Sequence, residues 1–409
     1  MVYQSNSAGL VSYKVQSGLG TQSAGSGGTV LRTAGGAGIK LTKAATESNE
    51  VRNDGMRSRG RHGTQKTTSD YAAELSLGSH DQIIEAIMRG TWDAVTLTAT
   101  EADMTSVTTG AHTIVAAAGS WITKGFRVGD VVRAAGLLDA ANNARNLRIT
   151  ALTALTMTVA ETLTVNASAD TSFTITRPGK RLINPTTLLK RYFTLDEYES
   201  DIDQSTILTD FVWSTLKISM SPNGLIMADP GGIGTGKIEA LATGVSPLLT
   251  SPTASTGAPM SVVDATIRYN GVDLVELTSF DLSLDIGASA PDVFGSGGIK
   301  YAPDVFSGQL GVSMNLGLLR KDLSALSDFI AETPLSLHVL AVDNETEPKD
   351  FVSIVVPNFT LGSADPSALS KQGGGRTQSI SVPQALIGQD TAGGAFDPTM
   401  IKIQTSSAA

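Results

Sequence analysis

The sequence predicts a mainly β protein with two tandem β-sandwich or half-barrel modules, each flanked by one α-helix, and a small β-barrel domain inserted into the first. Most long stretches alternate apolar and polar residues with period two, as half-buried strands do. A strand that runs directly into an amphipathic helix occurs twice, in residues 67–90 and 304–333. Gly is frequent at 42 residues and aromatic residues are few at 5%, which suits thin β layers with many turns.

The two expected helices each carry one apolar stripe at helical spacing. The stripe residues are Ile83, Ile84, Ile87 and Met88 in the first helix, and Leu319, Leu323, Leu326 and Ile330 in the second. Ser79 and Gln82 predict a capping box at the first helix start. If each helix covers the outer face of a sheet, four of these residues belong to the core and not to a functional site: Ile83, Ile87, Leu323 and Leu326.

The N-terminal region is expected to contain an arm, a hairpin and a long loop. Residues 1–26 are rich in Gly and Ser, which indicates either a disordered tail or an arm that orders against a neighbouring subunit. Residues 29–51 predict a hairpin with a Gly-rich tip. The loop at 52–66 is basic, and it is either solvated or docks on an acidic patch of a neighbouring subunit. Its contact candidates are Arg52, Arg57, Arg59, Arg61 and Lys66.

The remaining chain divides at changes of composition. The first module is expected in 27–92 and 180–240, interrupted by six short strands in 93–179 that form the inserted domain. A Gly/Pro/Ser/Thr-rich stretch at 241–259 indicates a linker.

The second module is expected in 260–395. It repeats the order of hairpin, long loop, strand, helix and further strands, and its hairpin turn is Asn270-Gly271. Residues 396–409 form a C-terminal extension in this interpretation.

The overall charge and composition exclude several functions. The formal net charge is −9 and the pI about 5.0, so tight binding to a phosphate backbone is not expected, although nucleic acid could pass such a surface. The chain has no cysteine, hence no disulfide or thiol nucleophile. There is no basic and apolar leader and no run of about 18 apolar residues. We therefore expect a soluble subunit made in the cytoplasm, with no membrane contact.

One short motif suggests nucleotide chemistry. Residues 231–237 fit the G-x-x-x-x-G-K pattern of a phosphate-binding loop, but Ile238 stands where the motif needs Ser or Thr for Mg²⁺. Pro230 precedes the stretch and its context is antiparallel β, so a structural loop is favoured. The four histidines lack metal-ligand spacing. We predict no catalytic, cofactor or metal site and no enzyme activity.

The acidic stretch in 196–203 has two interpretations. On a strand, residues two apart share a face, which would place four carboxylates on one side: Glu197, Glu199, Asp201 and Asp203. A Ca²⁺ loop would need a Gly turn at fixed spacing, and this is missing. A solvated anionic face is therefore expected, available as an acidic surface of an interface or a lumen.

Four stretches resemble the tail tube (major tail) proteins of phages with long, non-contractile tails. They are the basic loop leading into TTSDYAAELSLG, the helix SHDQIIEAIMRG, the segment YFTLDEYESDIDQSTILTDFVWSTLKISMSPNGL, and the run from DVFSGQLGVSMNL to FIAETPLSLHVL. The resemblance covers most of the chain outside 93–179. It implies β-sandwich subunits that close into rings, and rings that stack through loops and arms.

The resemblance also implies a function and a set of partners. The chain would be a structural virion protein, assembled in the host cytoplasm, whose tube conducts DNA into the host. Double-stranded DNA and a tape measure protein would occupy the lumen transiently, and tail tip and terminator proteins would bind the ends. With two modules per chain, three chains would form a pseudo-sixfold ring, with a true hexamer as the alternative. The competing interpretations are a baseplate protein or other structural β protein of the tail, and a nucleotide-binding enzyme using 231–237.

Overall fold

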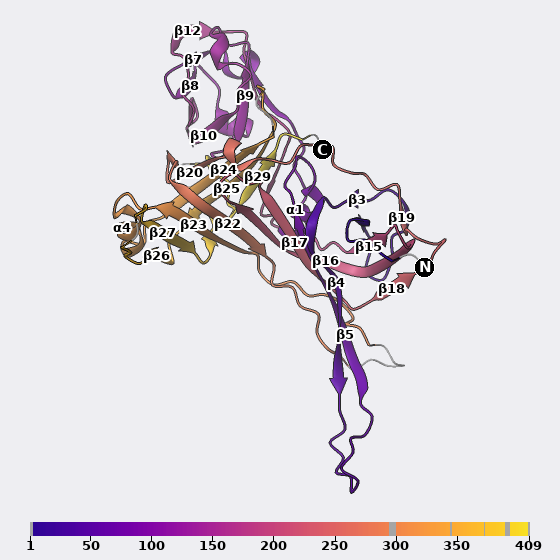
Figure 1. The fold of residues 1–409 in the computed structure, drawn as a ribbon. Coiled ribbons are helices and arrows are strands. Elements are labelled where there is room, and N and C mark those ends of the chain that lie inside the picture. The colour runs from indigo at the N-terminus through magenta and orange to yellow at the C-terminus, as the bar shows by residue number, and fades with distance from the viewer. Residues whose placement is uncertain (1–2, 294–299, 344–345, 372, 389–392, 408–409) are drawn as a thin grey trace.

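The computed structural model describes residues 3–293, 300–343, 346–371, 373–388 and 393–407, and its fold is mainly β (Figure 1). The principal sheets have 12, eight and seven strands. The prediction of a mainly β fold is confirmed. Part of the second expected loop, residues 294–299, lies outside the described residues.

The largest sheet contains a path of strands in which every neighbouring pair is antiparallel. In order, this path is β4 (Thr33–Thr46), β5 (Arg61–Ala73), β17 (Met227–Gly234), β16 (Gln204–Met220), β22 (Leu277–Asp285), β23 (Gly311–Leu319), β27 (Thr377–Val382) and β26 (Ser363–Pro366). We call it the front path. The N-terminal half of β16 leaves this path and pairs with β15 and β18 instead. The strands on this branch are β18 (Ile238–Leu241), β15 (Phe193–Glu199), β1 (Gly9–Val15) and β3 (Thr29–Val30).

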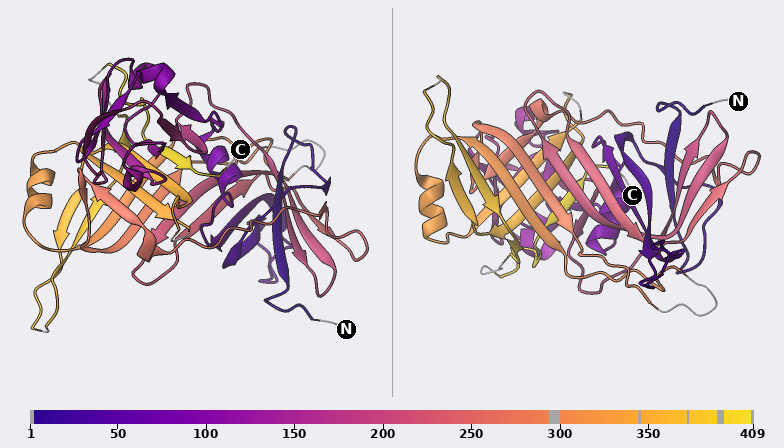
Figure 2. Two further views of the ribbon diagram at one scale, coloured as in Figure 1. Left: turned by 90° about the horizontal axis from the view of Figure 1, so that it is seen from above. Right: turned by 60° about the horizontal axis from the view of Figure 1, so that its bottom comes forward.

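The seven-stranded sheet lies behind the second half of the front path (Figures 1 and 2). Its strands are β14 (Lys180–Ile183), β29 (Lys402–Thr405), β25 (Phe351–Phe359), β24 (Leu335–Val342), β20 (Thr266–Tyr269) and β21 (Val272–Asp273), with β28 (Ala385–Leu386) beside β25. Leu282 and Met314 of the front path belong to the same buried cluster as Val339 and Ile354 of this sheet. The two layers therefore form a sandwich with an apolar interior.

The strand pairings of the first half recur in the second half. The pairs β1·β15, β15·β16 and β16·β18 are matched by β20·β24, β24·β25 and β25·β28. On the front path, β4·β5, β5·β17 and β17·β16 are matched by β22·β23, β23·β27 and β27·β26. The elements also follow the same order along the chain, and β16·β22 joins the two halves.

Residues 97–177 form a separate sheet with its own hydrophobic core. The strands are β6 (Leu97–Thr100), β7 (Val107–Thr109), β8 (Thr113–Ala116), β9 (Val131–Ala135), β10 (Leu147–Leu152), β11 (Thr156–Val159), β12 (Asn166–Asp170) and β13 (Thr174–Arg177). Three single turns of helix accompany them: α2 (Glu101–Met104), α3 (Trp121–Lys124) and η1 (Ala140–Asn142). Trp121 and Phe126 are buried at its centre, with ring centroids 5.7 Å apart. This unit projects from the sandwich (Figure 1).

The two expected helices have different environments. In α1 (Asp81–Met88), Ile83 and Ile87 are fully buried, as predicted. In α4 (Ser324–Ile330), no residue is buried. Leu323 and Leu326 are 59% and 37% exposed, so their prediction as core residues is wrong. Their helix lies at one end of the molecule (Figure 2), and Ile330 of the same stripe is 74% exposed.

The predicted capping box at the start of α1 is also wrong. The N-cap residue is His80, and it makes no side-chain cap bond. The Ser79 hydroxyl donates to the carbonyl oxygen of Ser76 at 2.8 Å and lies 2.6 Å from His80 Nδ1. These local bonds hold the turn that leads into the helix.

Both chain termini are part of the sheets. The expected N-terminal arm contains β1, whose Tyr13 is fully buried, and β2 (Gly25–Ser26), which pairs with β19 (Leu249–Thr250) of the expected linker. The expected C-terminal extension contains β29, which lies between β14 and β25 with Ile403 fully buried. Within the described residues both segments therefore fill sheet positions, β1 beside β15 and β29 between β14 and β25, and do not extend away from the fold as a free arm and extension.

The hairpin of β4 and β5 is longer than predicted. The Gly-rich stretch expected at its tip lies inside β4, and the hairpin turns within residues 47–60, which include part of the expected basic loop. Gly36 has φ +125°, and a Cβ there would approach Asp70 O and Tyr71 Cα to 2.7 Å. These glycines therefore permit bulges and close packing in the strand. The Asn270-Gly271 turn between β20 and β21 is confirmed, with φ of 45° and 81°.

Candidate functional site: the open face, its edges and its loops

One side of the front path lies in the core, and the other is polar. Because paired residues of neighbouring strands share a face, the register aligns these polar side chains in rows. One row consists of Ser219, Asp281, Asn315 and Ser381. Another consists of Asp70, Gly231, Thr215 and Asp285. We call this side the open face, since its charged side chains are exposed or half-buried.

The open face has an excess of negative charge. Its charged residues are Asp70, Asp229, Asp281, Asp285 and Asp365, together with Lys40, Lys66 and Lys217. Two of the lysines are in ion pairs: Lys217 Nζ lies 2.9 Å from Asp281, and Lys66 Nζ lies 3.2 Å from Asp292. Partial burial raises the pKa of Asp229, and the neighbouring Asp70 carboxylate raises it further, against the opposing effects of Ala73 N–H and Lys217. Such a face repels phosphate groups.

Sequence reasoning missed this face and selected other acids. The signal was present in residues 281–285, where Asp, Ser and Asp alternate with Leu in the period of a strand. Single strands do not reveal that their polar sides align across the sheet. That alignment depends on the register between strands distant in sequence.

The prediction that Glu197, Glu199, Asp201 and Asp203 line one side of a strand is wrong. β15 ends at Glu199, and Asp201 and Asp203 lie in the turn before β16, with Asp203 at φ +53°. Glu197 Oε2 accepts hydrogen bonds from Ile39 N at 3.0 Å and from the Tyr71 hydroxyl at 3.3 Å. Burial raises the pKa of Tyr71, and the Glu197 carboxylate raises it further. Glu197 thus ties β15 to the β4–β5 hairpin.

Asp201 and Asp203, in the turn before β16, accept hydrogen bonds from the N-terminal region and from the expected linker. Asp201 Oδ2 accepts from Ser5 N at 2.8 Å. Asp203 accepts from the Tyr198 hydroxyl at 3.1 Å and from Gly244 N at 2.9 Å. Asp201 and Asp203 therefore fix local chain segments.

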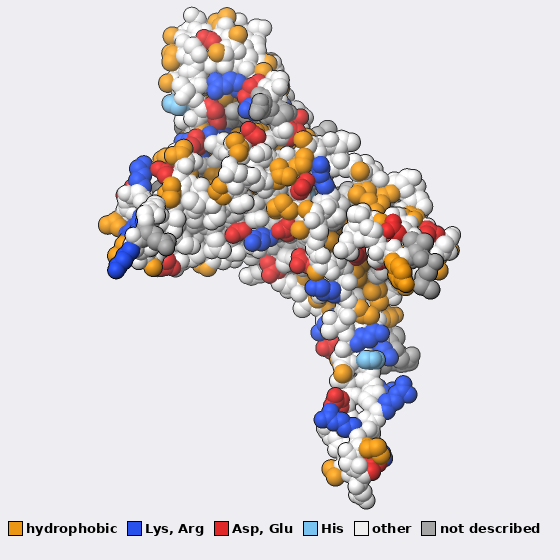
Figure 3. All heavy atoms as spheres, viewed as in Figure 1, with side chains coloured by type: hydrophobic (Ala, Val, Ile, Leu, Met, Phe, Trp, Pro, Cys, Tyr) orange, Lys and Arg blue, Asp and Glu red, His pale blue; other side chains and the backbone are white. Residues whose placement is uncertain are grey.

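The basic segment projects from the sandwich on the β4–β5 hairpin (Figures 1 and 3). Arg61 and Lys66 belong to β5, whereas Arg52, Arg57 and Arg59 lie at the tip. Arg52 binds Asp54 at 2.6 Å, and Arg57 lies 3.4 Å from Glu47. Val51 and Met56, also at the tip, are 95% and 64% exposed. The structure therefore brings Arg52, Arg57 and Arg59 together at a tip that is remote from the core, whereas Lys66 lies at the base of the hairpin on the open face.

The front path ends in two strands that each have a single partner. β4 pairs with β5 alone and β26 pairs with β27 alone, among the described residues. Within the described chain, their outer edges have no strand partner and can pair with another strand, although Ile39 N of β4 already donates to the Glu197 carboxylate. The two edges lie at opposite ends of the front path.

The motif in 231–237 is a strand and a tight turn. Residues up to Gly234 belong to β17, which lies between β5 and β16. A Cβ on Gly232 would approach Phe211 Cζ to 2.2 Å, so this glycine is required by packing. Lys237 is ion-paired with the buried Asp210 and lies 5.2 Å from the centroid of the Tyr301 ring. A phosphate loop between a strand and a helix is not formed here.

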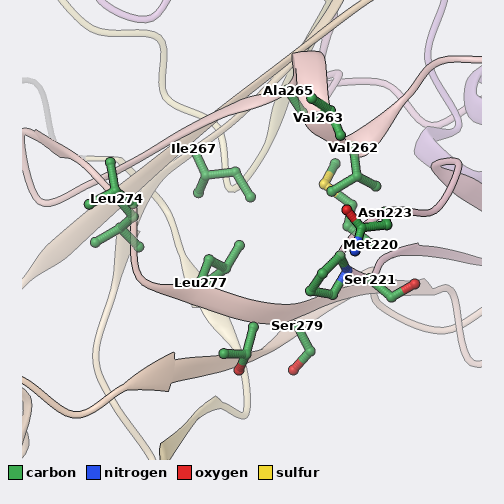
Figure 4. Close-up of a pocket in the computed structure, with 13 residues that line it drawn as sticks. Met220, Ser221, Asn223, Val262, Val263, Ala265, Ile267, Leu274, Leu277 and Ser279 are labelled. Carbon is green, nitrogen blue, oxygen red and sulfur yellow. The ribbon is translucent and has the colours of Figure 1, made fainter. Parts of the chain in front are cut away.

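One groove of the molecule has a mainly apolar lining without ionisable side chains. The groove in Figure 4 has a volume of about 260 Å³ and lies between the β16–β17 turn, η2 (Val262–Asp264) and the start of β22. Ile267, Leu274 and Leu277 line it, and none of its lining residues is an acid or a base. Within the described parts of the chain, no three His, Asp or Glu side chains are placed to hold a metal ion. No helix there is long and apolar enough to cross a membrane.

Comparison with known proteins agrees with the architecture. A family model described as phage tail tube protein matches residues 6–383, which includes both halves and the inserted unit. A comparison with curated proteins found no match. Because the match covers most of the 409 residues, the chain belongs to the phage tail tube protein family, a family of structural proteins of the phage tail.

Proposed function

We propose that this chain closes head to tail into rings that stack into the tail tube, with the open face lining the lumen. The observation that carries the proposal is the pair of free edges, β4 and β26, at opposite ends of one antiparallel path. A contact between two different edges is heterologous, and it generates a ring when the rotation closes. Ring closure also removes the exposed edges, which are an aggregation hazard in a monomer.

The junction between the two halves supplies a template for the contact between chains. β16 pairs antiparallel with β22, and β22 occupies in the second half the place that β4 has in the first. Strand directions alternate along the whole front path, so β26 would meet β4 of another copy in the same antiparallel sense. Each chain then contributes two tandem tube modules. Three chains form a pseudo-sixfold ring, and six chains form the alternative hexamer.

The charge of the open face suits a conduit for DNA. Aspartates outnumber lysines on it, and two of those lysines are ion-paired. Repulsion of the phosphate backbone lets double-stranded DNA pass without binding during ejection into the host. A tape measure protein would occupy the same lumen before ejection.

The basic hairpin is assigned to contacts between stacked rings. It reaches beyond the sandwich on one side and carries the arginines predicted from the sequence. Tail tip and terminator proteins would bind the two ends of the stack, and assembly would take place in the host cytoplasm. Glu199, Asp201 and Asp203 remain candidates for an acidic surface at a subunit interface.

Electron cryomicroscopy of the purified chain over a range of concentrations tests the proposal. We expect rings or tubes with a central hole. Their rotational symmetry should look sixfold at low resolution and threefold once the inserted unit is resolved. Six copies per ring would support the hexamer instead. Rings that never stack would indicate a baseplate component, and a compact monomer at every concentration would overturn the proposal.

A further inference from the structure

Helix α4 presents an apolar stripe to solvent at one end of the molecule (Figures 2 and 3). Ile330 is 74% exposed, and the stripe includes Leu323, Leu326 and Phe329. On the loop between β26 and β27, Leu369 is 84% exposed. Several exposed apolar side chains on one helix mark an interaction surface.

Helix α1 occupies the matching position in the first half, and there the stripe is buried. Ile83, Ile87 and Met88 are at most 1% exposed. Their cover includes β14, whose Leu182 belongs to the same core cluster. Lys180 of β14 binds Asp81 of α1 at 2.7 Å. β14 is a strand of the first half, but it pairs with β29 of the second half, and the Ser407 hydroxyl donates to Asp81 at 3.4 Å. The helix is therefore covered at the junction of the two halves.

Each helix also lies beside the strand that ends the front path of its half. α1 packs on β16, which pairs with β22, whereas α4 lies beside β26, whose outer edge has no partner among the described strands. The same two neighbours, a helix stripe and a strand edge, are therefore covered at the junction inside the chain and open at its end.

We infer that the α4 stripe is the binding surface for a second copy of this chain, so that the helix is covered at the contact between chains as α1 is covered at the junction of the two halves. The inference rests on the proposed ring, and it assigns the hydrophobic part of the contact between chains. The opposite end of the molecule offers a matching surface. On the core side of β4, Ile39 is half-buried and Leu41 is 38% exposed, whereas the core-side Leu282 and Leu284 of β22 are fully buried at the internal junction.

Single-cysteine labelling tests whether the α4 stripe is a contact between chains, because the chain contains no cysteine of its own. Ile330→Cys places a thiol on the stripe, and Val165→Cys places one at a position of the inserted unit that is 64% exposed. Both thiols react with a maleimide in the monomer. In isolated rings we expect the reaction at position 330 to slow at least 10-fold and the reaction at position 165 to stay unchanged.

A charge on the stripe gives a second measurement. Ile330→Glu alters an exposed side chain, so the circular dichroism spectrum and melting temperature of the monomer stay the same, and the concentration needed for rings rises at least 10-fold. Val165→Glu is the matched control with no such rise. Rings of the Ile330→Cys variant in which position 330 reacts as fast as in the monomer overturn this inference alone. A wild-type chain that never forms rings overturns the proposed function as well.

Discussion

His80 and His338 are buried as neutral imidazoles, and both make the fold sensitive to acid. Burial lowers the pKa of His80 to about 4. Burial lowers the pKa of His338 to about 3, and Arg148, Lys402 and Arg268 act in the same direction. Below a pH of about 6.5 the unfolded chain takes up protons that these buried rings cannot accept. The free energy of unfolding therefore falls as the pH drops from about 6.5 toward 4.

Urea unfolding between pH 7 and pH 4 tests this effect. Each histidine contributes a slope of at most about 1.4 kcal/mol per pH unit. The Ser353 hydroxyl lies 2.8 Å from His338 Nε2, and His338→Gln keeps a hydrogen-bonding partner for it. This variant should lose the part of the pH dependence of the free energy of unfolding that comes from His338. His62→Gln, at an exposed position, should leave the slope unchanged. An identical pH profile for His338→Gln and the wild type would contradict this account.

At the scale of the element, the β4–β5 hairpin should control stacking and leave ring closure intact. Its tip is remote from the core, and the Arg57 side chain is 87% exposed. Reversing both charges with Arg57→Glu and Arg59→Glu should therefore leave the fold and the rings unchanged. Attraction between exposed charges is screened by salt, so wild-type stacking should also weaken at high ionic strength.

Tube length in negative-stain images measures the effect of the hairpin. We expect the double variant to yield isolated rings or tubes several-fold shorter than those of the wild type. Arg145→Glu, a charge reversal on the inserted unit, should give tubes of normal length. Loss of the rings themselves in the double variant would assign the hairpin to ring closure instead.

At the scale of the whole molecule, a buried ionic cluster clamps the inserted unit to the C-terminal strand. Lys402 of β29 binds Asp130 of the inserted unit at 3.0 Å and Asp397 at 2.6 Å. Arg181 lies 3.3 Å from Asp397. Burial alone would raise the pKa of Asp397, but Lys402 and Arg181 hold it below its usual value. The inserted unit is therefore a fixed part of the molecule, and deleting residues 93–179 would leave Lys402 without one of its two carboxylates.

Removing one partner of this cluster should be costly. Asp130→Ala should lower the free energy of unfolding by about 3 kcal/mol, because the buried Lys402 ammonium keeps only one of its two carboxylates. Replacing both members, with Asp130→Ala and Lys402→Met, should recover much of that loss, since an apolar pair has no desolvation penalty. Urea unfolding of the two variants measures both values. Asp365→Ala, at an exposed aspartate, should stay within about 0.5 kcal/mol of the wild type. Equal free energies of unfolding for the single and double variants would contradict the stabilising role of the Asp130–Lys402 pair.

Local patterns in the sequence were sufficient to predict the class of the fold. Alternation with period two marked β16 and β22, and Asn270-Gly271 marked a turn. Both helices were found because an amphipathic stripe is a property of consecutive residues. The repeated order of elements was visible as well. These features depend on neighbours in the chain, and the sequence lists those neighbours directly.

The tertiary structure decided which surfaces are buried and which are open. The stripes of α1 and α4 look alike in sequence, but only α1 is covered, because β14 and β16 pack on it where the two halves meet. The glycines at 231–237 imitate a phosphate loop, yet Gly232 is required by the Phe211 ring on a neighbouring strand. The acidic open face arises only when strands from distant segments align in register. Burial, cover and register are set by residues far apart in the chain, and no local pattern encodes them.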